Sequence, residues 1–480
     1  MDRDTFLEIY KKRPEAVYEI IQNQNDQIQA LKEMVHQLTE RVRELVARLN
    51  KNSQNSNRPP SSDGLSRKDR RAKERKSKKK RGGQKGHEGN QLKMTASPDR
   101  RTIHRATRCR RCNESLAGVA VKGHKRRQVF DLPRIEIEVT EHQAEVKECP
   151  HCGTITEALF PEGVTRPAQY GSRIKGFITY LSQYQLIPYE RITELLEDLC
   201  GVRISTGTIY NVNRTAYEAG AESEAQVREL LKKQTLLHTD ETGVFCGGSL
   251  KWLHVLSTDR LTYYCIHARR GKEAIEDMGI IPGYSGRLMH DFWGSYLSYE
   301  CGHVFCNAHV IRELTGIHED YGQKWAADMI GLLLSAKKQT DSRTKRLNSV
   351  TIGKFEKSYD RNVTRGFRCN PHLSEQSGRR GRKKKSKPLN LLVRLRDYKA
   401  GILGFMYDFT VPFDNNQAER DLRMAKVKQK ISGCFRSDEG GLFFARIRGY
   451  ISTVKKHNAN VFDALLGLFE NRPFMPFCAE

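Results

Sequence analysis

Two aspartates, each near the end of an apolar run, have side chains and positions that suit catalysis. Asp240 stands near the end of Thr235–Glu241, and Asp291 ends the run Gly286–Asp291. Carboxylate oxygens are the ligands that Mg²⁺ prefers, and paired ions suit phosphodiester chemistry because they activate one oxygen and stabilise the leaving one. Glu419 is the candidate for a third carboxylate. The alternative is that each acid is only a surface or capping residue.

The segment around Glu419 is predicted to be a helix. Asp414 can cap its start. Asn416, Glu419 and Arg423 then lie on one face, since they are three and four residues apart. A carboxylate beside an amide and a cation suits metal and phosphate together. Arg420 and Arg423 are therefore expected to contact DNA phosphate, with surface solubility as the alternative.

The elements around these acids follow a recognisable order. The expected elements are strands at Thr235–Glu241, Lys251–Thr258 and Thr262–His267, a helix at Lys272–Ile280, and a strand at Gly286–Asp291. Three antiparallel strands, a helix and a further strand are the order of the ribonuclease-H-like fold, in which the fourth strand pairs with the first. Asp240 and Asp291 would then stand side by side.

A long stretch separates Asp291 from Glu419. It begins with a short strand at Val304–Asn307 and a helix at Ala308–Asp320, and it is too long for one strand and a linker. We therefore expect an insertion at about 318–395, helical over Lys324–Lys338. Its basic run Arg379–Lys387 indicates DNA contact, or else a solvated loop. The lysines expected at DNA are Lys383, Lys384 and Lys385.

Two CxxC pairs indicate a zinc ribbon. Four thiolates satisfy tetrahedral Zn²⁺, and each tight turn supplies two of them. Between the pairs, Gln128–Val146 alternates apolar and polar residues and predicts strand. One structural zinc is expected, with a redox role as the alternative. The predicted ligands are Cys109, Cys112, Cys149 and Cys152.

A second group of metal-compatible residues lies near the end of the fifth predicted strand. It consists of Cys301, His303, Cys306 and His309. Their spacing is irregular for zinc, and a strand-to-helix junction explains it equally well.

The N-terminal segment is helical and has a heptad pattern. Its a positions are β-branched or Leu, and leucines occupy three d positions, which favours a parallel two-stranded coiled coil; Gln24 weakens the first d position. The alternative is one amphipathic helix packed on its own chain. A linker rich in Asn, Ser and Pro and a basic arm follow. The arm residues expected at DNA are Lys78, Lys79, Lys80 and Arg81.

The segment Leu186–Ala219 resembles a helix-turn-helix. An apolar stripe runs through Tyr189–Leu199, Gly201 ends that helix, and Ser205 can cap the next one. Because helical pairs are common, a role in reading DNA is one of two interpretations.

Charge and composition limit the class of protein. The chain has 480 residues, a formal net charge of +26 and 12 cysteines. An excess of this size points to a polyanion, first of all nucleic acid. We find no apolar run long enough to span a membrane and no signal-peptide pattern. A cytoplasmic protein with reduced thiols is therefore expected.

The motifs together resemble a known family, the bacterial DDE transposases of the insertion sequence 66 class. The resemblance runs through the NSQNSNRPPSSDG linker, GGQKGHEG, the CxxC…CPHCG ribbon, HTDET, HDFWGSY and CNAHVIREL. Its longest motif is PFDNNQAERDLRMAKVKQKISGCFRS. By resemblance, Asp240, Asp291 and Glu419 form the catalytic triad. Cys306 and His309 match a Cys/His signature of related transposases, and we expect them, with Asn416, to support the active site.

The resemblance implies a multidomain α/β protein. The expected parts are a coiled coil (1–50), a basic linker (51–100), a zinc ribbon (101–160), a helical DNA-binding segment (161–228), a ribonuclease-H-like catalytic domain with a helical insertion (229–465), and a tail (466–480). The expected cofactors are two Mg²⁺ (or Mn²⁺) ions and one Zn²⁺. The expected partners are element ends and target DNA, a second copy or more of the chain, and accessory proteins encoded by the same element.

The predicted function is to bind the terminal inverted repeats of an insertion sequence, cleave a strand there and transfer it to a target. Such an enzyme would be cytoplasmic and associated with a bacterial nucleoid. One alternative is a structure-selective nuclease or resolvase that cuts without joining. Another is a zinc-ribbon DNA-binding regulator that has no activity.

Overall fold

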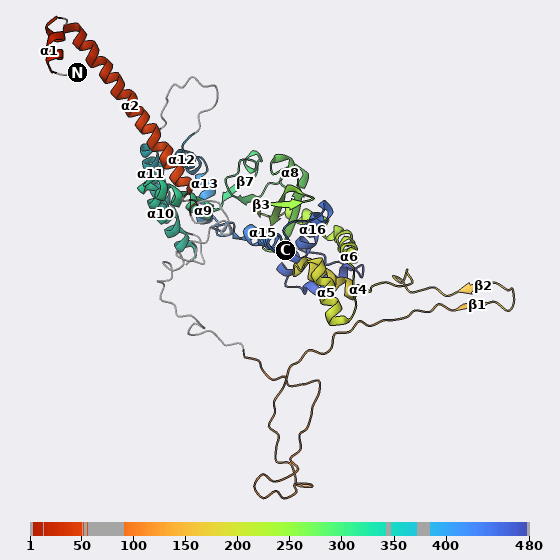
Figure 1. The fold of residues 1–480 in the computed structure, drawn as a ribbon. Coiled ribbons are helices and arrows are strands. Elements are labelled where there is room, and N and C mark those ends of the chain that lie inside the picture. Colours follow the sequence, from red (N-terminus) through yellow and green to blue (C-terminus); the bar gives the residue numbers. More distant parts are fainter. Residues whose placement is uncertain are drawn as a thin grey trace. The chain divides into compact units, whose positions relative to one another are not determined.

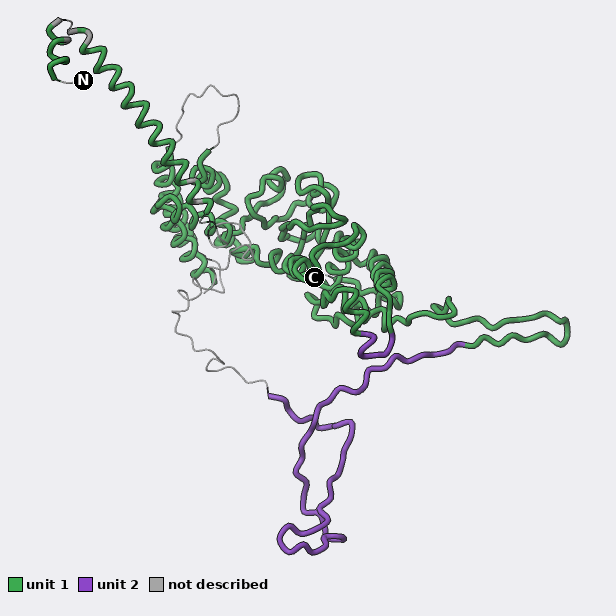
Figure 2. The backbone as a smooth tube through the Cα atoms, in the orientation of Figure 1, with its two compact units in different colours: residues 1–64, 143–195, 203–480 green, residues 65–142, 196–202 purple. Residues whose placement is uncertain are grey.

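The computed structural model describes residues 3–12, 14–49, 51, 55, 91–341, 347–371 and 385–477. The chain divides into two compact units, and each is described by itself (Figure 2). The first comprises residues 1–64, 143–195 and 203–480, and the second comprises residues 65–142 and 196–202.

A five-stranded mixed sheet forms the centre of the first unit. Its strands are β3 (Leu236–Cys246), β4 (Ser249–Ser257), β5 (Thr262–His267), β6 (Arg287–His290) and β7 (Gly302–Phe305). The order across the sheet is β5-β4-β3-β6-β7. The first three strands are antiparallel neighbours, whereas β6 is parallel to β3 and β7 is parallel to β6. The predicted pairing of the fourth strand with the first is therefore confirmed.

Helices cover both faces of this sheet (Figure 1). On one face, α15 (Asn416–Ser432) and α16 (Asp438–Lys456) pack on β3, β4 and β5 through Val255, Leu422 and Phe444. On the other, α7 (Ala221–Lys232) and α8 (Lys272–Met278) share a cluster with Leu256 and Leu288. Apolar side chains therefore point to both faces of the strands, as in a sheet buried between two layers.

A helical insertion separates β7 from α15, and it extends beyond both ends of the range 318–395 expected from the sequence. It consists of α9 (Asn307–Tyr321), α10 (Lys324–Asp341), α11 (Ser349–Cys369), α12 (Lys387–Asp397), α13 (Lys399–Ile402) and α14 (Gly404–Tyr407). These helices have their own core, which includes Trp325 and Tyr359, and Phe305 of β7 joins it. The insertion is therefore packed on the sheet at β7.

Another group of helices precedes the sheet. These are α4 (Ser172–Thr179), the π-helical turn Tyr180–Tyr184, α5 (Tyr189–Cys200) and α6 (Thr206–Ala219). The Ser205 hydroxyl accepts a hydrogen bond from the N–H of Thr208, so the predicted cap is confirmed. Gly201 follows α5 in the left-handed region, at φ 70°. Ala216 of α6 packs against α16 and α17 (Val461–Leu468).

The N-terminal segment is helical over α1 (Arg3–Lys12) and α2 (Pro14–Leu49). The apolar side chains of the α2 heptads are exposed, from Ile21 (48% exposed) to Leu45 (49%). No helix among the described residues has the length and apolar character needed to span a membrane.

The expected strand over Gln128–Val146 is wrong for all but its last residue. The structure has only β1 (Val146–Glu148) paired with β2 (Ile155–Glu157) in this region, and residues 128–145 have no strand. Alternation alone does not form a strand without a neighbour to accept its hydrogen bonds. Val129 and Val139 are almost fully exposed, so no apolar face is buried either.

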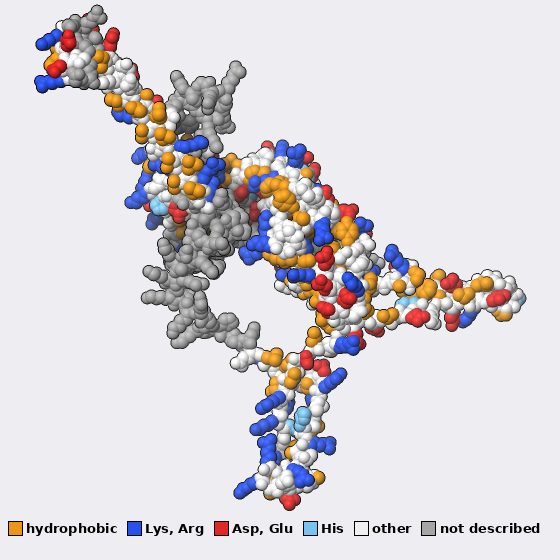
Figure 3. All heavy atoms as spheres, in the orientation of Figure 1, with side chains coloured by type: hydrophobic (Ala, Val, Ile, Leu, Met, Phe, Trp, Pro, Cys, Tyr) orange, Lys and Arg blue, Asp and Glu red, His pale blue; other side chains and the backbone are white. Residues whose placement is uncertain are grey.

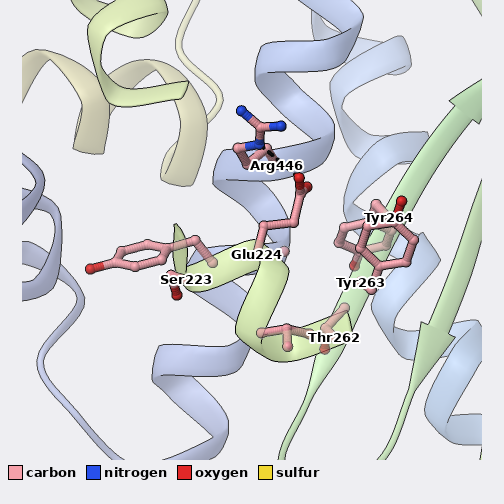
Figure 4. A pocket seen from close by; sticks show the side chains of 9 residues that line it. Ser223, Glu224, Thr262, Tyr263, Tyr264 and Arg446 are labelled. Atoms are coloured by element: carbon pink, nitrogen blue, oxygen red, sulfur yellow. Dashed lines mark hydrogen bonds and ion pairs between the residues drawn. The ribbon is translucent and has the colours of Figure 1, made fainter. Parts of the chain in front are cut away.

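A cavity of about 10 Å³ lies between α7, β5 and α16 (Figure 4). Glu224 and Arg446 form an ion pair beside it, with Arg446 over the ring of Tyr217. A space of this size holds about one water molecule. It is therefore a packing feature and too small for a nucleotide.

A buried ion pair fixes α15 between α16 and the β4–β5 turn. Lys456 and Asp421 are 2.9 Å apart, and their side chains are only 12% and 9% exposed. The ammonium also donates to the carbonyls of Thr258 and Leu261 and to the Thr262 hydroxyl. Such full hydrogen bonding is what makes a buried charge tolerable.

We expect Lys456→Met to lower the free energy of unfolding of the sheet domain, which is the five-stranded sheet with the helices packed on it. The expected loss is about 3–5 kcal/mol, because the substitution leaves the Asp421 carboxylate buried without its cation. Urea unfolding followed by tryptophan fluorescence measures this. Lys455→Met, at the exposed neighbouring residue, is the matched control. Equal effects of the two substitutions would contradict the assignment.

Candidate carboxylate and metal site

The parallel pairing of β3 and β6 brings Asp240 and Asp291 to one edge of the sheet. The register pairs His238 with Met289, and each aspartate lies two residues further along its own strand direction. The two aspartates therefore lie at the same level of two adjacent strands, just beyond the last paired residues. The fifty residues between them contain the rest of β3, then β4, β5, α8 and β6.

Asp240 lies in an environment that opposes its negative charge. Burial raises the pKa of Asp240 well above its ordinary value, and the negative charges of Glu241, Asp291 and Glu419 raise it further. The backbone N–H of Glu241 donates to the Asp240 carboxylate at 2.9 Å, and this hydrogen bond lowers the pKa of Asp240. A bound cation would relieve this repulsion, so the donor set fits a divalent metal ion with oxygen ligands.

Asn415 holds the start of α15 against β3. Its side chain accepts a hydrogen bond from His238 Nδ1 (2.9 Å) and donates one to the carbonyl of Thr239 (2.8 Å). Its backbone N–H donates to the sulfur of Cys306 at 3.2 Å. Because Asn415 is almost fully buried, these bonds fix the helix start, and Glu419 follows one turn later.

Glu419 contacts residues of α9 in this structure. Arg312 Nη2 donates to Glu419 Oε1 at 3.2 Å, and His309 Nδ1 lies 4.0 Å from the same oxygen. The ligand atoms of Cys306, His309 and Glu419 all lie within 4.8 Å of one another. The Glu419 carboxylate therefore lies beside a Cys/His pair, and its negative charge helps to raise the pKa of Asp240.

Asp291 is held by its own loop and by two nearby cations. The N–H of Trp293 donates to its carboxylate at 2.9 Å. Burial raises the pKa of Asp291, whereas the Trp293 N–H and the charges of Arg270 and Arg394 lower it. Arg394 comes from α12 and stacks on Phe292, so the insertion contributes directly to the site.

Glu241 adds a fourth carboxylate, on the opposite face of β3 from Asp240. Its side chain is only 2% exposed and binds Arg270 through Oε1 at 2.5 and 2.9 Å. Tyr296 donates its hydroxyl proton to Oε2. The Arg270 guanidinium lies between the rings of Trp252 and Trp293, 4.9 and 4.4 Å from their centroids. Arg270 thus ties β3, β4 and the Asp291 loop together.

The cap predicted for the Glu419 helix differs from the observed one. Asn415, not Asp414, is the residue at the cap position, because its side chain is engaged with β3 and helical geometry begins at Asn416. The Asp414 carboxylate still accepts the N–H of Asn416, at 3.2 Å. Asn416 and Arg423 are exposed, as is Arg420, while Glu419 is half-buried.

The structure separates the four residues of the second metal-compatible group. His303 lies 2.9 Å from His290 through ring nitrogens and contacts the carbonyl of Tyr299. Cys301 packs against the apolar cluster under α8. Cys306 and His309 instead join Glu419. Only half of the group is therefore near the carboxylates.

Each predicted zinc-binding pair lies on a tight turn of the same kind. The Asn113 N–H donates to the carbonyl of Cys109 (3.0 Å), and the Gly153 N–H donates to that of Cys149 (2.8 Å). Asn113 and Gly153 both have left-handed φ, at 56° and 69°. The two pairs belong to different units.

These turns also favour thiolates. Hydrogen bonds from the backbone of Cys112 and Arg111 lower the pKa of Cys109, and hydrogen bonds with Thr154 lower that of Cys152. Lowered thiol pKa values suit zinc ligation, which requires the deprotonated sulfur.

The predicted DNA-contact residues are placed unevenly. Arg420 and Arg423 are exposed along α15, and Lys385 is half-buried before α12. The other predicted contacts, Lys78, Lys79, Lys80, Arg81, Lys383 and Lys384, lie outside the described residues.

Several residues of the site were not found by sequence reasoning. Glu241 and Asn415 stand next to predicted residues in motifs that were noted, so their position was a usable signal. Arg270 and Arg312 have no such signal, because their contacts with Glu241 and Glu419 span 29 and 107 residues. Tyr296 lies within HDFWGSY, but its bond to Glu241 depends on the fold.

The chain matches three models of known protein families. The family described as "Transposase IS66 family" matches residues 167–442, which is more than half of the chain and includes all three predicted acids. The "zinc-finger binding domain of transposase IS66" matches residues 106–153, which includes both CxxC pairs. A family of unknown function matches residues 12–93. No curated protein matches the chain.

We expect Arg270→Met to lower the free energy of unfolding by about 2–3 kcal/mol, because Glu241 loses its cation while remaining buried. The value is below that for a fully buried pair because Arg270 is 39% exposed. Chemical unfolding measures it, and Glu241→Gln in the same chain should recover most of the loss. Arg269→Met, at an exposed neighbour, is the control. Failure of the double variant to recover would show that Arg270 acts elsewhere.

Proposed function

Because the chain belongs to the transposase IS66 family, we propose that it binds the ends of an insertion sequence, cleaves a DNA strand there and transfers it to a target. The observation that supports this most directly is the convergence of Asp240, Asp291 and Glu419 from β3, the end of β6 and α15. Repulsion among them is felt at Asp240. Carboxylates that are buried together repel one another. They are therefore poor structural residues but good ligands for a cation.

We assign the sheet domain to the ribonuclease-H-like fold. The strand order β5-β4-β3-β6-β7, with three antiparallel strands followed by two parallel ones, supports this assignment. The helices between β7 and α15, which precede Glu419, also support the assignment as an insertion into that fold.

Asp240, Asp291 and Glu419 would hold two Mg²⁺ or Mn²⁺ ions. When bound, such ions lower the pKa of an attacking hydroxyl and stabilise charge on the leaving oxygen. Asn415 fixes the position of Glu419 relative to β3, and Arg270 fixes the Asp291 loop. Asn416 is the first residue of α15 and lies one turn before Glu419, so we assign it a supporting role.

DNA would be bound by several parts of the chain. Arg420 and Arg423 are exposed on the helix that carries Glu419, so we assign them to the phosphates next to the cleaved bond. The basic arm, the helix pair α5–α6 and the insertion's basic run would hold the element ends. The four CxxC cysteines would bind one structural zinc, and the zinc-finger match supports this.

Cleavage of a labelled element end tests the triad. With Mg²⁺, Asp240→Asn, Asp291→Asn and Glu419→Gln should each reduce nicking by about 10²-fold or more, because each removes a negatively charged ligand. Asp414→Asn, which removes a carboxylate at the start of the same helix without touching the cluster, is the matched control.

The outcomes separate the alternatives. Nicking that is never followed by joining to a second DNA would favour a nuclease or resolvase. DNA binding without any cleavage, also after addition of the element's accessory proteins, would favour a regulator. Full cleavage by Glu419→Gln would show that the third acid is wrongly assigned.

We also propose that α2 pairs two chains. Figure 3 shows apolar side chains along the exposed length of this helix. Val35, Leu38 and Val42 are each about 60% exposed, and they occupy successive a and d positions. A solvated stripe of this kind is stabilised when a second copy covers it. Pairing suits an element that has two ends.

Leu38→Glu should weaken dimerisation by about 10²–10⁴-fold, since each of the two chains loses about 1.5–3 kcal/mol of leucine burial. Light scattering during size-exclusion chromatography measures the mass. Gln37→Glu adds the same charge at the neighbouring residue, which faces away from the predicted seam, and should remain dimeric. A Leu38→Glu protein that remains dimeric would rule out this coiled coil.

A further inference from the structure

Three ligand types meet beside the carboxylates. Cys306 directly precedes α9, His309 lies in the first turn of α9, and Glu419 lies in the first turn of α15. Their sulfur, nitrogen and oxygen atoms all lie within 4.8 Å of one another. A thiolate, an imidazole and a carboxylate are the three ligand types that Zn²⁺ takes in proteins, and three protein ligands leave a fourth position open.

Burial raises the pKa of the Cys306 thiol, and backbone N–H groups beside the sulfur act against that rise. The residue is 1% exposed, and the backbone N–H of Asn415 donates to its sulfur at 3.2 Å. Hydrogen bonds of this kind favour the thiolate once a metal ion is present. Because Asn415 is also fixed to β3, the sulfur has a defined direction.

His309 offers a nitrogen that lacks a partner. Its Nδ1 is excluded from solvent and makes no hydrogen bond with any described residue. The 4.0 Å separation from Glu419 Oε1 is too long for a hydrogen bond. Leaving a buried polar atom unsatisfied is unfavourable, and a cation between this nitrogen and the carboxylate would satisfy both.

We propose that Cys306, His309 and Glu419 form a zinc site separate from the CxxC cysteines. On binding, the thiol proton of Cys306 is released to solvent. Arg312 donates to the same oxygen of Glu419, so it competes with zinc and keeps the affinity moderate.

Zinc binding at this site does not depend on the proposed function, but its consequence does. A Glu419 carboxylate bound to zinc is withdrawn from the Mg²⁺ ligand set of Asp240 and Asp291. Zinc is therefore expected to inhibit DNA cleavage by competing for Glu419.

Metal stoichiometry of the full chain tests the site. After equilibrium dialysis against zinc, the wild-type protein should bind one more zinc per chain than Cys306→Ser or His309→Gln. Cys434→Ser removes an exposed thiol at the end of α15 and should bind as the wild type does. Cobalt in place of zinc gives a second readout. The thiolate-to-metal absorption of the wild type should exceed that of Cys306→Ser, because the CxxC contribution is common to both.

Equal metal content in the wild type and both site variants, with unchanged thermal unfolding, would overturn the proposal. A cleavage assay then separates the two hypotheses. Zinc should inhibit Mg²⁺-dependent nicking by the wild type at least tenfold more strongly than nicking by Cys306→Ser. Extra zinc without any nicking would leave the zinc site standing and refute the proposed function. Nicking without extra zinc would support the proposed function and refute the zinc site.

Discussion

The charge repulsion at Asp240 is the constraint on which the rest of the site depends. Burial and three neighbouring acids all oppose ionisation of this carboxylate. A protein that keeps such a cluster must offset the repulsion with nearby cations. Arg270 neutralises Glu241, Arg312 binds Glu419, and Arg270 and Arg394 act on Asp291. These cations make the cluster tolerable, and none of them contacts Asp240 among the described hydrogen bonds and ion pairs. Under the proposed function, a metal ion would supply the positive charge beside Asp240.

A few buried hydrogen bonds and one buried ion pair fix the position of α15. Asn415 joins β3, the residue before α9 and the first turn of α15, so three segments that are distant in sequence move together. Lys456 and Asp421 fix the middle of α15 to the β4–β5 turn. The helix that carries Glu419 is therefore held at two points. Rigid support is what a metal site needs, because its ligands must keep their places before the ion arrives.

Sequence reasoning found the strands of the sheet and proposed the acids because each leaves a local signal. An apolar run that ends in Asp marks β3 and β6, and their pairing follows from the order of elements. It failed for Gln128–Val146, where alternation was read without a partner strand, and it placed the cap of α15 one residue early. It could not find Arg270 or Arg312, because long-range ion pairs have no sequence period. It also grouped Cys301 and His303 with Cys306, although the fold directs them to different clusters.

The Cys/His pair shows how one carboxylate can belong to two sites. Glu419 lies close enough to Asp240 to raise its pKa, yet its nearest contacts are Arg312 and His309. A hard ion held by the aspartates would bind the Glu419 carboxylate in one site, whereas a softer ion held by the thiol and the imidazole would bind it in the other. Glu419, whose side chain is 35% exposed, is thus the residue that both proposed sites need. If both proposals hold, the concentrations and affinities of the two ions would decide which site contains Glu419, so zinc would act as a competitive inhibitor of the transposase.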